Sequence, residues 1–131
     1  MIYEATTQKI TVRVEPSFVE DESAPLSDQY FWAYSVEIYN GGNERLQLVS
    51  RYWLITDALG RSQEIRGPGV VGEQPVLDPG ESFRYTSGAP LSTASGIMQG
   101  HYVMETEDGE SFEVVIPAFS LDSPYIVGMP N

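Results

Sequence analysis

The sequence has no cysteine, a single histidine and only seven basic residues among its 131. The lack of cysteine excludes disulfides, thiolate nucleophiles and cysteine-ligated centres such as zinc fingers and iron–sulfur clusters. One histidine, His101, cannot build a multi-histidine metal site. Nineteen acidic residues give a formal net charge of −12. Such a charge repels a phosphate backbone, so nucleic acid is not an expected partner.

Long apolar runs are also missing. No stretch approaches the roughly 18 uninterrupted apolar residues of a membrane span, and residues 1–14 lack the apolar region of a signal peptide. We therefore expect no membrane span and a cytoplasmic location. The length argues for a single domain, residues 1–131, whose folding buries about two-thirds of the extended chain's surface.

The dominant hydrophobic period is two, which is typical of strands with one buried face. No window of ten or more residues predicts an amphipathic helix with caps. The run from Leu46 to Asp57 is apolar on both faces, which predicts a bulge or a central strand covered on both sides. Seven predicted strands lie near residues 10–14, 32–38, 46–57, 62–66, 83–85, 97–107 and 110–118.

Turn residues separate these runs. The segments Asp57–Gly60, Asp78–Glu81 and Glu107–Glu110 each contain a glycine and an aspartate, and Asn40–Asn43 contains two glycines. Residues 16–28, with two prolines and an acidic triplet, are predicted to form an exposed loop. The pattern predicts an all-β fold, an antiparallel β-sandwich of about seven strands of the immunoglobulin or fibronectin type III kind. A small barrel is the alternative.

The aromatic residues fall on both faces of the second predicted strand. Trp32 and Trp53 lie in the two most apolar runs and are predicted to pack in the core. Phe31 and Tyr39 have the opposite parity from Trp32. They are expected either to be buried in the core or at its rim, or to form an apolar patch for a protein partner.

The segment Gly67–Gly72 matches the pattern G-x-G-x-x-G. Pro75 and Pro79 prevent the helix that a dinucleotide-binding fold places after this pattern, and the Gly-Lys-Ser/Thr of a P-loop is missing. Two interpretations remain: a connection between strands, and a nest of backbone amides that binds phosphate or pyrophosphate. A side chain at Gly69 would block such a nest, and the loop is predicted to lie outside the strands. The candidate anion-binding residues are Arg66, Gly67, Gly69, Gly72 and Arg84.

Catalytic and metal-binding patterns are not apparent. No G-x-S-x-G motif accompanies His101, which lies in a predicted strand and is expected to be structural. The acidic segments at residues 20–22 and 105–113 have no EF-hand spacing and predict only weak attraction of divalent cations. We therefore predict no catalytic residue, no dedicated metal site and no cofactor.

The glycine segment continues into Glu73-Gln74-Pro75-x-Leu77-x-Pro79-Gly80-Glu81 and then Phe83-x-Tyr85-x-Ser87-Gly88. Together with Ser50–Asp57 and Gly96–Tyr102, this pattern covers nearly the whole chain and resembles the ApaG family. Tyr52 stands where a histidine is expected in many members.

The resemblance implies a lone fibronectin-type β-sandwich in a bacterial cytoplasm. It also implies a CorD-like association with cobalt resistance and magnesium efflux, without an established enzymatic activity. Related domains occur as interaction modules in larger eukaryotic proteins. The leading hypothesis is a non-enzymatic interaction module that acts in Co²⁺/Mg²⁺ homeostasis through an unidentified protein partner. The alternative is a small-ligand binder that holds phosphate or pyrophosphate in the Gly67–Gly72 loop.

Overall fold

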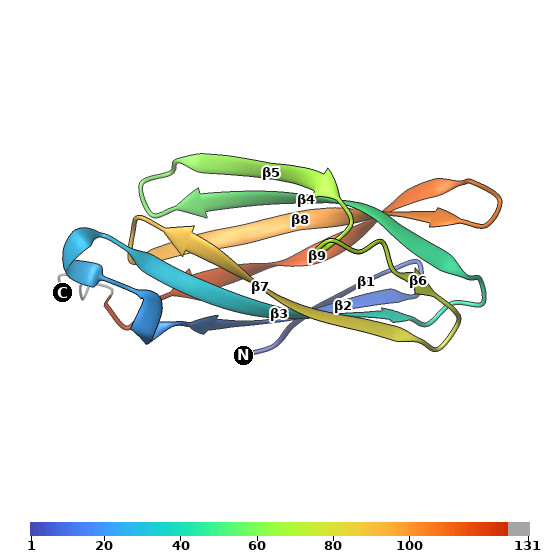
Figure 1. Ribbon diagram of the computed structural model, residues 1–131, viewed down its shortest axis with the longest axis horizontal. Helices are drawn as coiled ribbons and strands as arrows, with labels where there is room; N and C mark the ends of the chain where they lie inside the picture. The colour runs from blue at the N-terminus through green and yellow to red at the C-terminus, as the bar shows by residue number, and fades with distance from the viewer. Residues whose placement is uncertain (126–131) are drawn as a thin grey trace.

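The computed structural model describes residues 1–125, which form nine β-strands and two single-turn 3-10 helices. Figure 1 shows two layers of strands that run along the length of the molecule. The strands are β1 (Tyr3–Thr7), β2 (Ile10–Phe18), β3 (Tyr30–Asn40), β4 (Leu46–Asp57), β5 (Ser62–Pro68), β6 (Val76–Leu77), β7 (Ser82–Leu91), β8 (Ser95–Thr106) and β9 (Ser111–Asp122), and the 3-10 helices are η1 (Glu20–Glu22) and η2 (Pro25–Ser27).

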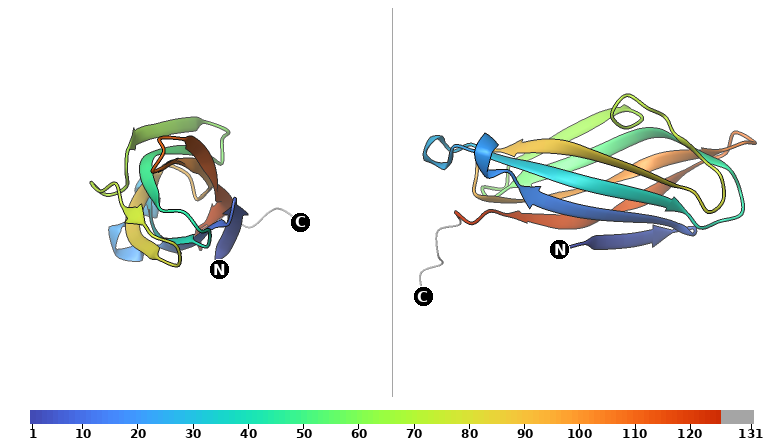
Figure 2. Two further views of the ribbon diagram at one scale, coloured as in Figure 1. Left: turned by 90° about the vertical axis from the view of Figure 1, so that its right-hand side faces the viewer. Right: turned by 60° about the horizontal axis from the view of Figure 1, so that its bottom comes forward.

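Two antiparallel sheets make up the fold. One sheet has the strand order β1-β2-β3-β7, and the other has the order β5-β4-β8-β9, with β6 pairing with the first residues of β4. Seen from the end in Figure 2, the sheets surround a common core, and β1 lies against β9. Because the two hydrogen-bonded ladders remain separate, the fold is a β-sandwich and not a closed barrel, which confirms the predicted fold class.

All seven predicted strands are present, and β1 and β6 are two strands that the sequence did not predict. β1 pairs with β2 through a two-residue turn at Gln8 and Lys9, whose φ angles are 46° and 69°. Turns of this kind usually contain Asn or Gly, so the sequence has no turn signal there. β6 has only two residues, which is too short to show an alternating pattern.

Strand β4 contains the predicted bulge. It lies between β5 and β8, but its outer face has half-buried side chains such as Tyr52 and Leu54, so it is not the central strand covered on both sides that was the alternative. Its register against β8 shifts between Leu48 and Ser50. Leu48 before the bulge and Trp53 after it are both buried although their parities differ, because an extra residue turns the following side chains to the other face. Arg51 therefore shares the inward-facing parity of Trp53.

Both tryptophans are buried as predicted, Trp32 in one sheet and Trp53 in the other. Phe31 is half-buried over Gly88 of the neighbouring strand β7, whereas Tyr39 is exposed. Eight residues of strand place these two positions roughly 26 Å apart. Phe31 and Tyr39 therefore lie toward opposite ends of β3.

Residues 16–28 are more ordered than the exposed loop that the sequence predicted. β2 continues to Phe18, and η1 and η2 follow it. The Ser23 hydroxyl donates to the carbonyl of Val19 (2.7 Å) and accepts from the amide of Phe31 (2.9 Å), which fixes the segment against β3. Within residues 1–125, no helix has the length and apolar character needed to cross a membrane.

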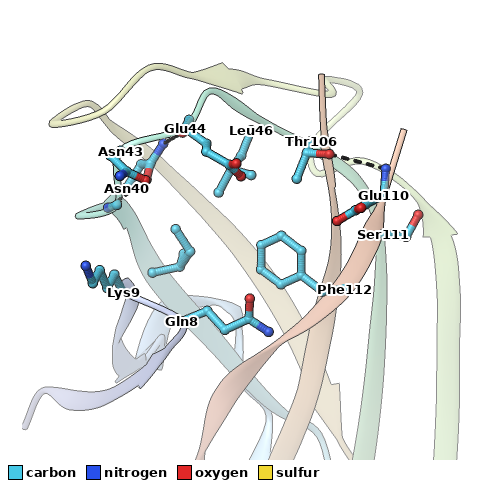
Figure 3. Close-up of a pocket in the computed structure, with 12 residues that line it drawn as sticks. Gln8, Lys9, Asn40, Asn43, Glu44, Leu46, Thr106, Glu110, Ser111 and Phe112 are labelled. Atoms are coloured by element: carbon cyan, nitrogen blue, oxygen red, sulfur yellow. Dashed lines mark hydrogen bonds between the residues drawn. The ribbon is translucent and has the colours of Figure 1, made fainter. Parts of the chain in front are cut away.

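One end of the sandwich holds an open pocket of about 460 Å³. Its walls are the β1–β2 turn, the β3–β4 connection and the β8–β9 hairpin (Figure 3). Ile10, Leu46 and Phe112 form its apolar part, and the remaining lining side chains are polar or charged.

Candidate functional site

The glycine segment forms a small hairpin that is anchored in the core. The amides of Val70 and Glu73 each donate to the other residue's carbonyl, both over 2.8 Å. Val71 and Gly72 at the tip have φ angles of 43° and 81°, as a two-residue hairpin turn of type I′ requires. Val70 is fully buried, while the Val71 side chain is 54% exposed. The segment is therefore a structured connection whose tip faces solvent.

The bulge in β4 determines where this hairpin attaches. Val49 is the residue that the register shift leaves without a partner in β8. Its carbonyl accepts hydrogen bonds from the Gly69 amide and the Gln74 side chain, both at 2.8 Å. The amides of Gly69, Val70 and Glu73 thus donate within the protein. In the described hairpin, only the tip amides of Val71 and Gly72 make no backbone hydrogen bond.

Two of the candidate glycines have steric roles. Gly67 belongs to β5, not to a loop outside the strands as predicted, and a Cβ there would lie 3.0 Å from Nη2 of Arg51. Gly69 is buried with a φ of +58°, and a Cβ there would lie 2.0 Å from the Glu73 carbonyl oxygen. Both glycines therefore make room for neighbouring protein atoms.

Arg51 is the arginine that contacts this segment, and the sequence reasoning missed it. Its Nη1 donates to the carbonyls of Pro68 (3.0 Å) and Gly69 (2.9 Å). These carbonyls, and not the amides, face the guanidinium. Arg51 has the same parity as Trp53 and Ile55, whose side chains face the core. This parity places Arg51 on the inner face only when the position of the bulge is known.

A pair of buried tyrosines lies near Arg51. The hydroxyls of Tyr85 and Tyr102 are 2.5 Å apart and form a hydrogen bond between the two sheets. Burial raises the pKa of both phenols well above the ordinary value of 10, although the charge of Arg51 acts in the opposite direction. Both tyrosines are therefore neutral at physiological pH, and the pair stabilises the core.

The two candidate arginines lie on different sheets. Arg66 is on the outer face of β5, where its guanidinium lies 4.6 Å from the centre of the Tyr52 ring and 3.1 Å from Glu64 Oε2. Arg84 is on β7 of the other sheet, with Nη2 2.6 Å from Glu37 Oε2. The structure therefore keeps Arg66 beside the hairpin and holds Arg84 in an ion pair on the other sheet.

Arg66 belongs to a row of side chains that crosses the outer face of the larger sheet. The Tyr52 ring on β4 stacks on His101 on β8, with ring centres 5.1 Å apart. His101 Nε2 lies 3.5 Å from Glu113 Oε2 on β9. The Tyr52 hydroxyl donates to Glu64 (2.7 Å), which lowers the pKa of that carboxyl. His101 thus packs on the sheet surface, and we call Arg66, Tyr52, His101 and Glu113 the outer-face row.

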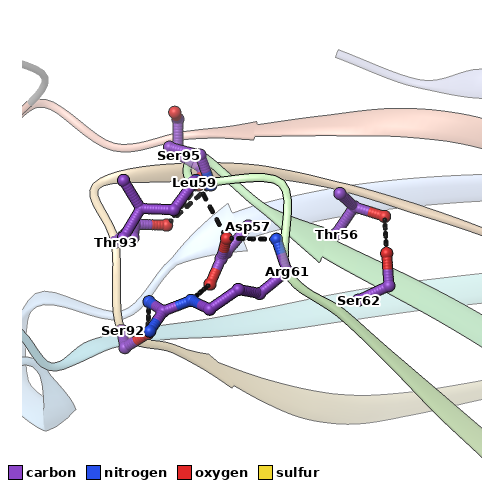
Figure 4. Close-up of polar contacts among 9 residues, drawn as sticks. Thr56, Asp57, Leu59, Arg61, Ser62, Ser92, Thr93 and Ser95 are labelled. Atoms are coloured by element: carbon purple, nitrogen blue, oxygen red, sulfur yellow. Dashed lines mark hydrogen bonds and ion pairs between the residues drawn. The ribbon is translucent and has the colours of Figure 1, made fainter.

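A second polar network joins the β4–β5 turn to the β7–β8 turn (Figure 4). Asp57 accepts hydrogen bonds from the amides of Leu59 (2.9 Å) and Arg61 (3.0 Å) and from Arg61 Nε (2.8 Å). Arg61 Nη2 continues to the Ser92 hydroxyl (3.2 Å) between β7 and β8. Arg61 is therefore engaged at the β4–β5 turn.

This network predicts a pH-dependent stability. Partial desolvation acts to raise the pKa of Asp57, but the hydrogen bonds from Arg61 and Leu59 outweigh it and hold the pKa below its ordinary value of 3.8. Asp57 thus stabilises the fold above that pH and loses its contribution as the pH falls toward the lowered pKa. We expect Asp57→Asn to be less stable than the wild type at about pH 6, with a difference that shrinks toward about pH 2.5. Urea unfolding at both pH values measures this difference in the free energy of unfolding.

Asp122→Asn is the matched control, because Asp122 is exposed and no ion pair involves it in residues 1–125. The free energy of unfolding of this variant is expected to differ little from that of the wild type at both pH values. A difference between wild type and Asp57→Asn that stays constant between the two pH values would contradict the linkage.

Protein sites for divalent cations bring several carboxylate or imidazole side chains close together. Within the described residues, no group of three or more such side chains is placed to hold a metal ion. The predicted weak attraction of divalent cations by the carboxylates stays a prediction.

The hairpin, the bulge that holds it and the outer-face row lie almost wholly in a segment that known proteins share. Residues 20–106 match the ApaG domain family. The chain belongs to the ApaG family. The protein ApaG of Methylorubrum populi is 62% identical over 125 residues, which cover 95% of this chain and 96% of that protein. The protein ApaG of Afipia carboxidovorans is 58% identical over 125 residues, with the same coverage.

A solved structure agrees with this assignment. The crystal structure of the ApaA protein from Bordetella pertussis has a TM-score of 0.86 and 50% sequence identity, and it covers 89% of this chain and 95% of that chain. The names of the two ApaG relatives state no enzymatic activity and no ligand. The family match, the identity to the ApaG relatives and the similar solved structure together confirm the resemblance to the ApaG family.

Proposed function

We propose that this ApaG-family chain is a non-enzymatic interaction module that binds a protein partner through the outer face of its larger sheet. The observation that supports the proposal is the outer-face row, in which an exposed arginine and a half-buried tyrosine and histidine are stacked on the surface of the sheet. Val115, which pairs with His101, adds an aliphatic side chain that is 51% exposed. Aromatic and arginine side chains are the residues most enriched at protein interfaces.

A non-enzymatic role agrees with the chemistry of the ionisable residues. The one histidine is packed between Tyr52 and Glu113, and the buried tyrosines are neutral. We propose further that residues 1–131 act as one domain in the cytoplasm. In the same proposal the partner belongs to Co²⁺/Mg²⁺ homeostasis, with carboxylates that attract these cations only weakly. The support for this last step is what membership of the family implies.

Affinity capture from a native bacterial lysate tests the partner proposal. We expect the wild type to recover a protein that Val115→Glu does not recover, because a buried, unpaired carboxylate disfavours an interface. Recovery is expected to change when Mg²⁺ or Co²⁺ is added. Leu26→Glu is the control, since Leu26 is fully exposed but lies in η2, outside the larger sheet. If no protein is lost specifically from the Val115→Glu capture, with or without the ions, the proposal is wrong.

Anion binding at the glycine hairpin is the second candidate function. The observation that favours it is the pair of tip amides at Val71 and Gly72, which make no backbone hydrogen bond in the described hairpin. Arg66 lies two residues before Pro68, the last residue of β5 that pairs with β4, and supplies a nearby positive charge. Phosphate or pyrophosphate bound there would contact the tip and not the interior, where Gly67 and Gly69 make room for Arg51 and Glu73.

A pyrophosphate titration followed by amide NMR tests this second function. We expect shifts at residues 71–73, weaker binding for Arg66→Gln and a smaller salt dependence in that variant. Arg84→Gln separates the two candidate arginines, because Arg84 is held by Glu37 on the other sheet. The absence of any shift in the wild type at millimolar pyrophosphate would exclude the site.

A further inference from the structure

Each sheet of the sandwich has one outer strand that another strand covers and one that is left open. β1 and β9 cover each other, because they lie side by side and the Val115 amide of β9 donates to the Thr7 hydroxyl of β1 (3.1 Å). β5 and β7, at the opposite ends of the two sheets, pair on one side only within residues 1–125. Figure 1 shows β5 along the margin of the larger sheet. An open edge of this kind is a template for pairing with a strand of another chain.

The hydrogen bonds of β5 show which of its backbone groups face outward. Next to the β4–β5 ladder, the amide of Asp57 donates to the carbonyl of Arg61, the residue opposite it (2.9 Å). Hydrogen-bonded and non-hydrogen-bonded pairs alternate along an antiparallel ladder. Ile65 therefore directs its backbone groups at β4, whereas the amides and carbonyls of Glu64 and Arg66 point away from it. Outside the strand ladders, no hydrogen bond within residues 1–125 uses these outward groups.

Pro68 agrees with this alternation and ends the open edge. It lies opposite Ser50 at a position of the outward kind, where the missing N–H costs the β4 ladder nothing. Its carbonyl accepts a hydrogen bond from Arg51 Nη1 (3.0 Å) and is thus occupied. A further strand is therefore offered the backbone groups of Glu64 and Arg66.

The side chains of β5 are complementary to those of a second, antiparallel β5. With Ile65 on the twofold axis, Glu64 of each copy lies opposite Arg66 of the other. Glu64 and Arg66 are both exposed and pair within one chain over 3.1 Å, so in a dimer each carboxylate lies between two guanidiniums. Opposite charges on facing strands are favourable. β5 itself has no net charge, which limits repulsion between two chains of charge −12.

Apolar side chains are exposed beyond both ends of β5. Leu59, in the β4–β5 turn, is 71% exposed, and Val71, at the tip of the glycine hairpin, is 54% exposed. Because two antiparallel copies run in opposite directions, the turn of each copy comes next to the hairpin of the other. Apolar contact is thus offered at both ends of the pairing.

The open edge of β7 lacks this self-complementarity. The Asn40 amide donates to the carbonyl of Glu81 (2.9 Å), just before β7 begins, so the same alternation applies. The outward positions of β7 are Ser82, Arg84, Thr86, Gly88 and Pro90. They include no carboxylate that could pair with Arg84 of a second copy.

We propose that this protein forms a dimer with a second copy of itself by pairing the edges of β5, which joins two larger sheets into one continuous antiparallel sheet. A twofold contact of this kind is closed and uses the same surface on both copies. β5 has 7 residues, against the roughly 20–30 residues per partner of a stable interface, so the dimer is transient. The outer face of the sheet stays open, and the dimer does not depend on either proposed function.

Sedimentation equilibrium of the purified full chain, at concentrations up to about 1 mM, tests the dimer. The mass of the wild type is expected to rise with concentration toward that of a dimer. Glu64→Arg and Arg66→Glu each place like charges opposite one another and are expected to weaken dimerisation at least about tenfold. The combination of Glu64→Arg with Arg66→Glu restores the opposite charges and is expected to dimerise as the wild type does.

Glu15→Arg is the matched control, since it makes the same change of charge at an exposed position of β2 on the other sheet. It is expected to dimerise like the wild type. A wild type that stays monomeric at about 1 mM, or single charge reversals that dimerise as it does, would overturn the proposal.

A single introduced cysteine gives a test that does not depend on the charged variants, because the chain has no cysteine of its own. Ile65→Cys places two thiols in a non-hydrogen-bonded pair on the twofold axis, within reach of a disulfide. With oxidised glutathione as the oxidant, we expect covalent dimers to form at least about tenfold faster than with Ile97→Cys. Ile97 lies on β8 and is 47% exposed, whereas Ile65 is half-buried, so exposure alone favours the control. Equal rates would overturn the proposed register.

Discussion

Gly100→Ala is expected to destabilise the protein by about 4 kcal/mol or more, a large part of the roughly 5–15 kcal/mol that stabilises a typical domain. Gly100 lies on β8 beside the register shift against β9, and β8 pairs with both β4 and β9. A Cβ at this position would lie 1.9 Å from the Tyr52 carbonyl oxygen and 3.2 Å from the Trp53 Cα. Both are backbone atoms of β4, so the clash is relieved only by separating two central strands.

Urea unfolding followed by tryptophan fluorescence measures this effect, since Trp53 pairs directly with Gly100. Gly42→Ala is the control, because the nearest atom to a Cβ there is 3.4 Å away and the change restricts only the unfolded chain. A Gly100→Ala protein that folds and loses less than about 1 kcal/mol would show that β4 and β8 separate more easily than the packing implies.

Gly69→Ala is expected to remove about 3 kcal/mol or more of stability and to open the glycine hairpin. The residue combines a positive φ with a Cβ position 2.0 Å from the Glu73 carbonyl oxygen. That oxygen accepts the hydrogen bond from the Val70 amide, so the clash also displaces the fully buried Val70 side chain. Gly69→Ala is consequently a test of the fold and not of anion binding alone.

Gly72→Ala provides the comparison within the same hairpin. Gly72 has a φ of +81° but no atom within 4 Å of a Cβ, so the change costs about 1 kcal/mol of backbone strain only. Unfolding free energies of the two variants, with hydrogen exchange of the Val70 amide, separate strain from steric clash. Equal losses of stability in Gly69→Ala and Gly72→Ala would contradict the steric explanation.

The sequence was sufficient to predict the fold class because the buried faces repeat with the period of a strand. Ile10, Val12 and Val14 alternate with exposed or half-exposed residues, and all three are buried. The Asp57–Gly60 and Glu107–Glu110 segments form the turns that their residues predicted. β1 was missed because Gln8 and Lys9 form its turn without a turn-favouring residue.

Only the tertiary structure decided which residues meet at the candidate sites. Arg66 precedes the glycine segment in the sequence, but its side chain lies over Tyr52. The hairpin carbonyls bind Arg51, which lies fifteen residues before Arg66. Strand alternation gives each residue a face, whereas the bulge in β4 reverses that assignment, and no local pattern marks the bulge position. Lys9 and Glu110 lie 101 positions apart and line one pocket because β2 and β9 begin at the same end of the sandwich. The sequence thus determined seven of the nine strands in residues 1–125, and the family of the chain. The pairing of the strands and the register shifts determined which charged side chains are left without a partner. Contacts between side chains depend on distances between strands, which local sequence does not encode.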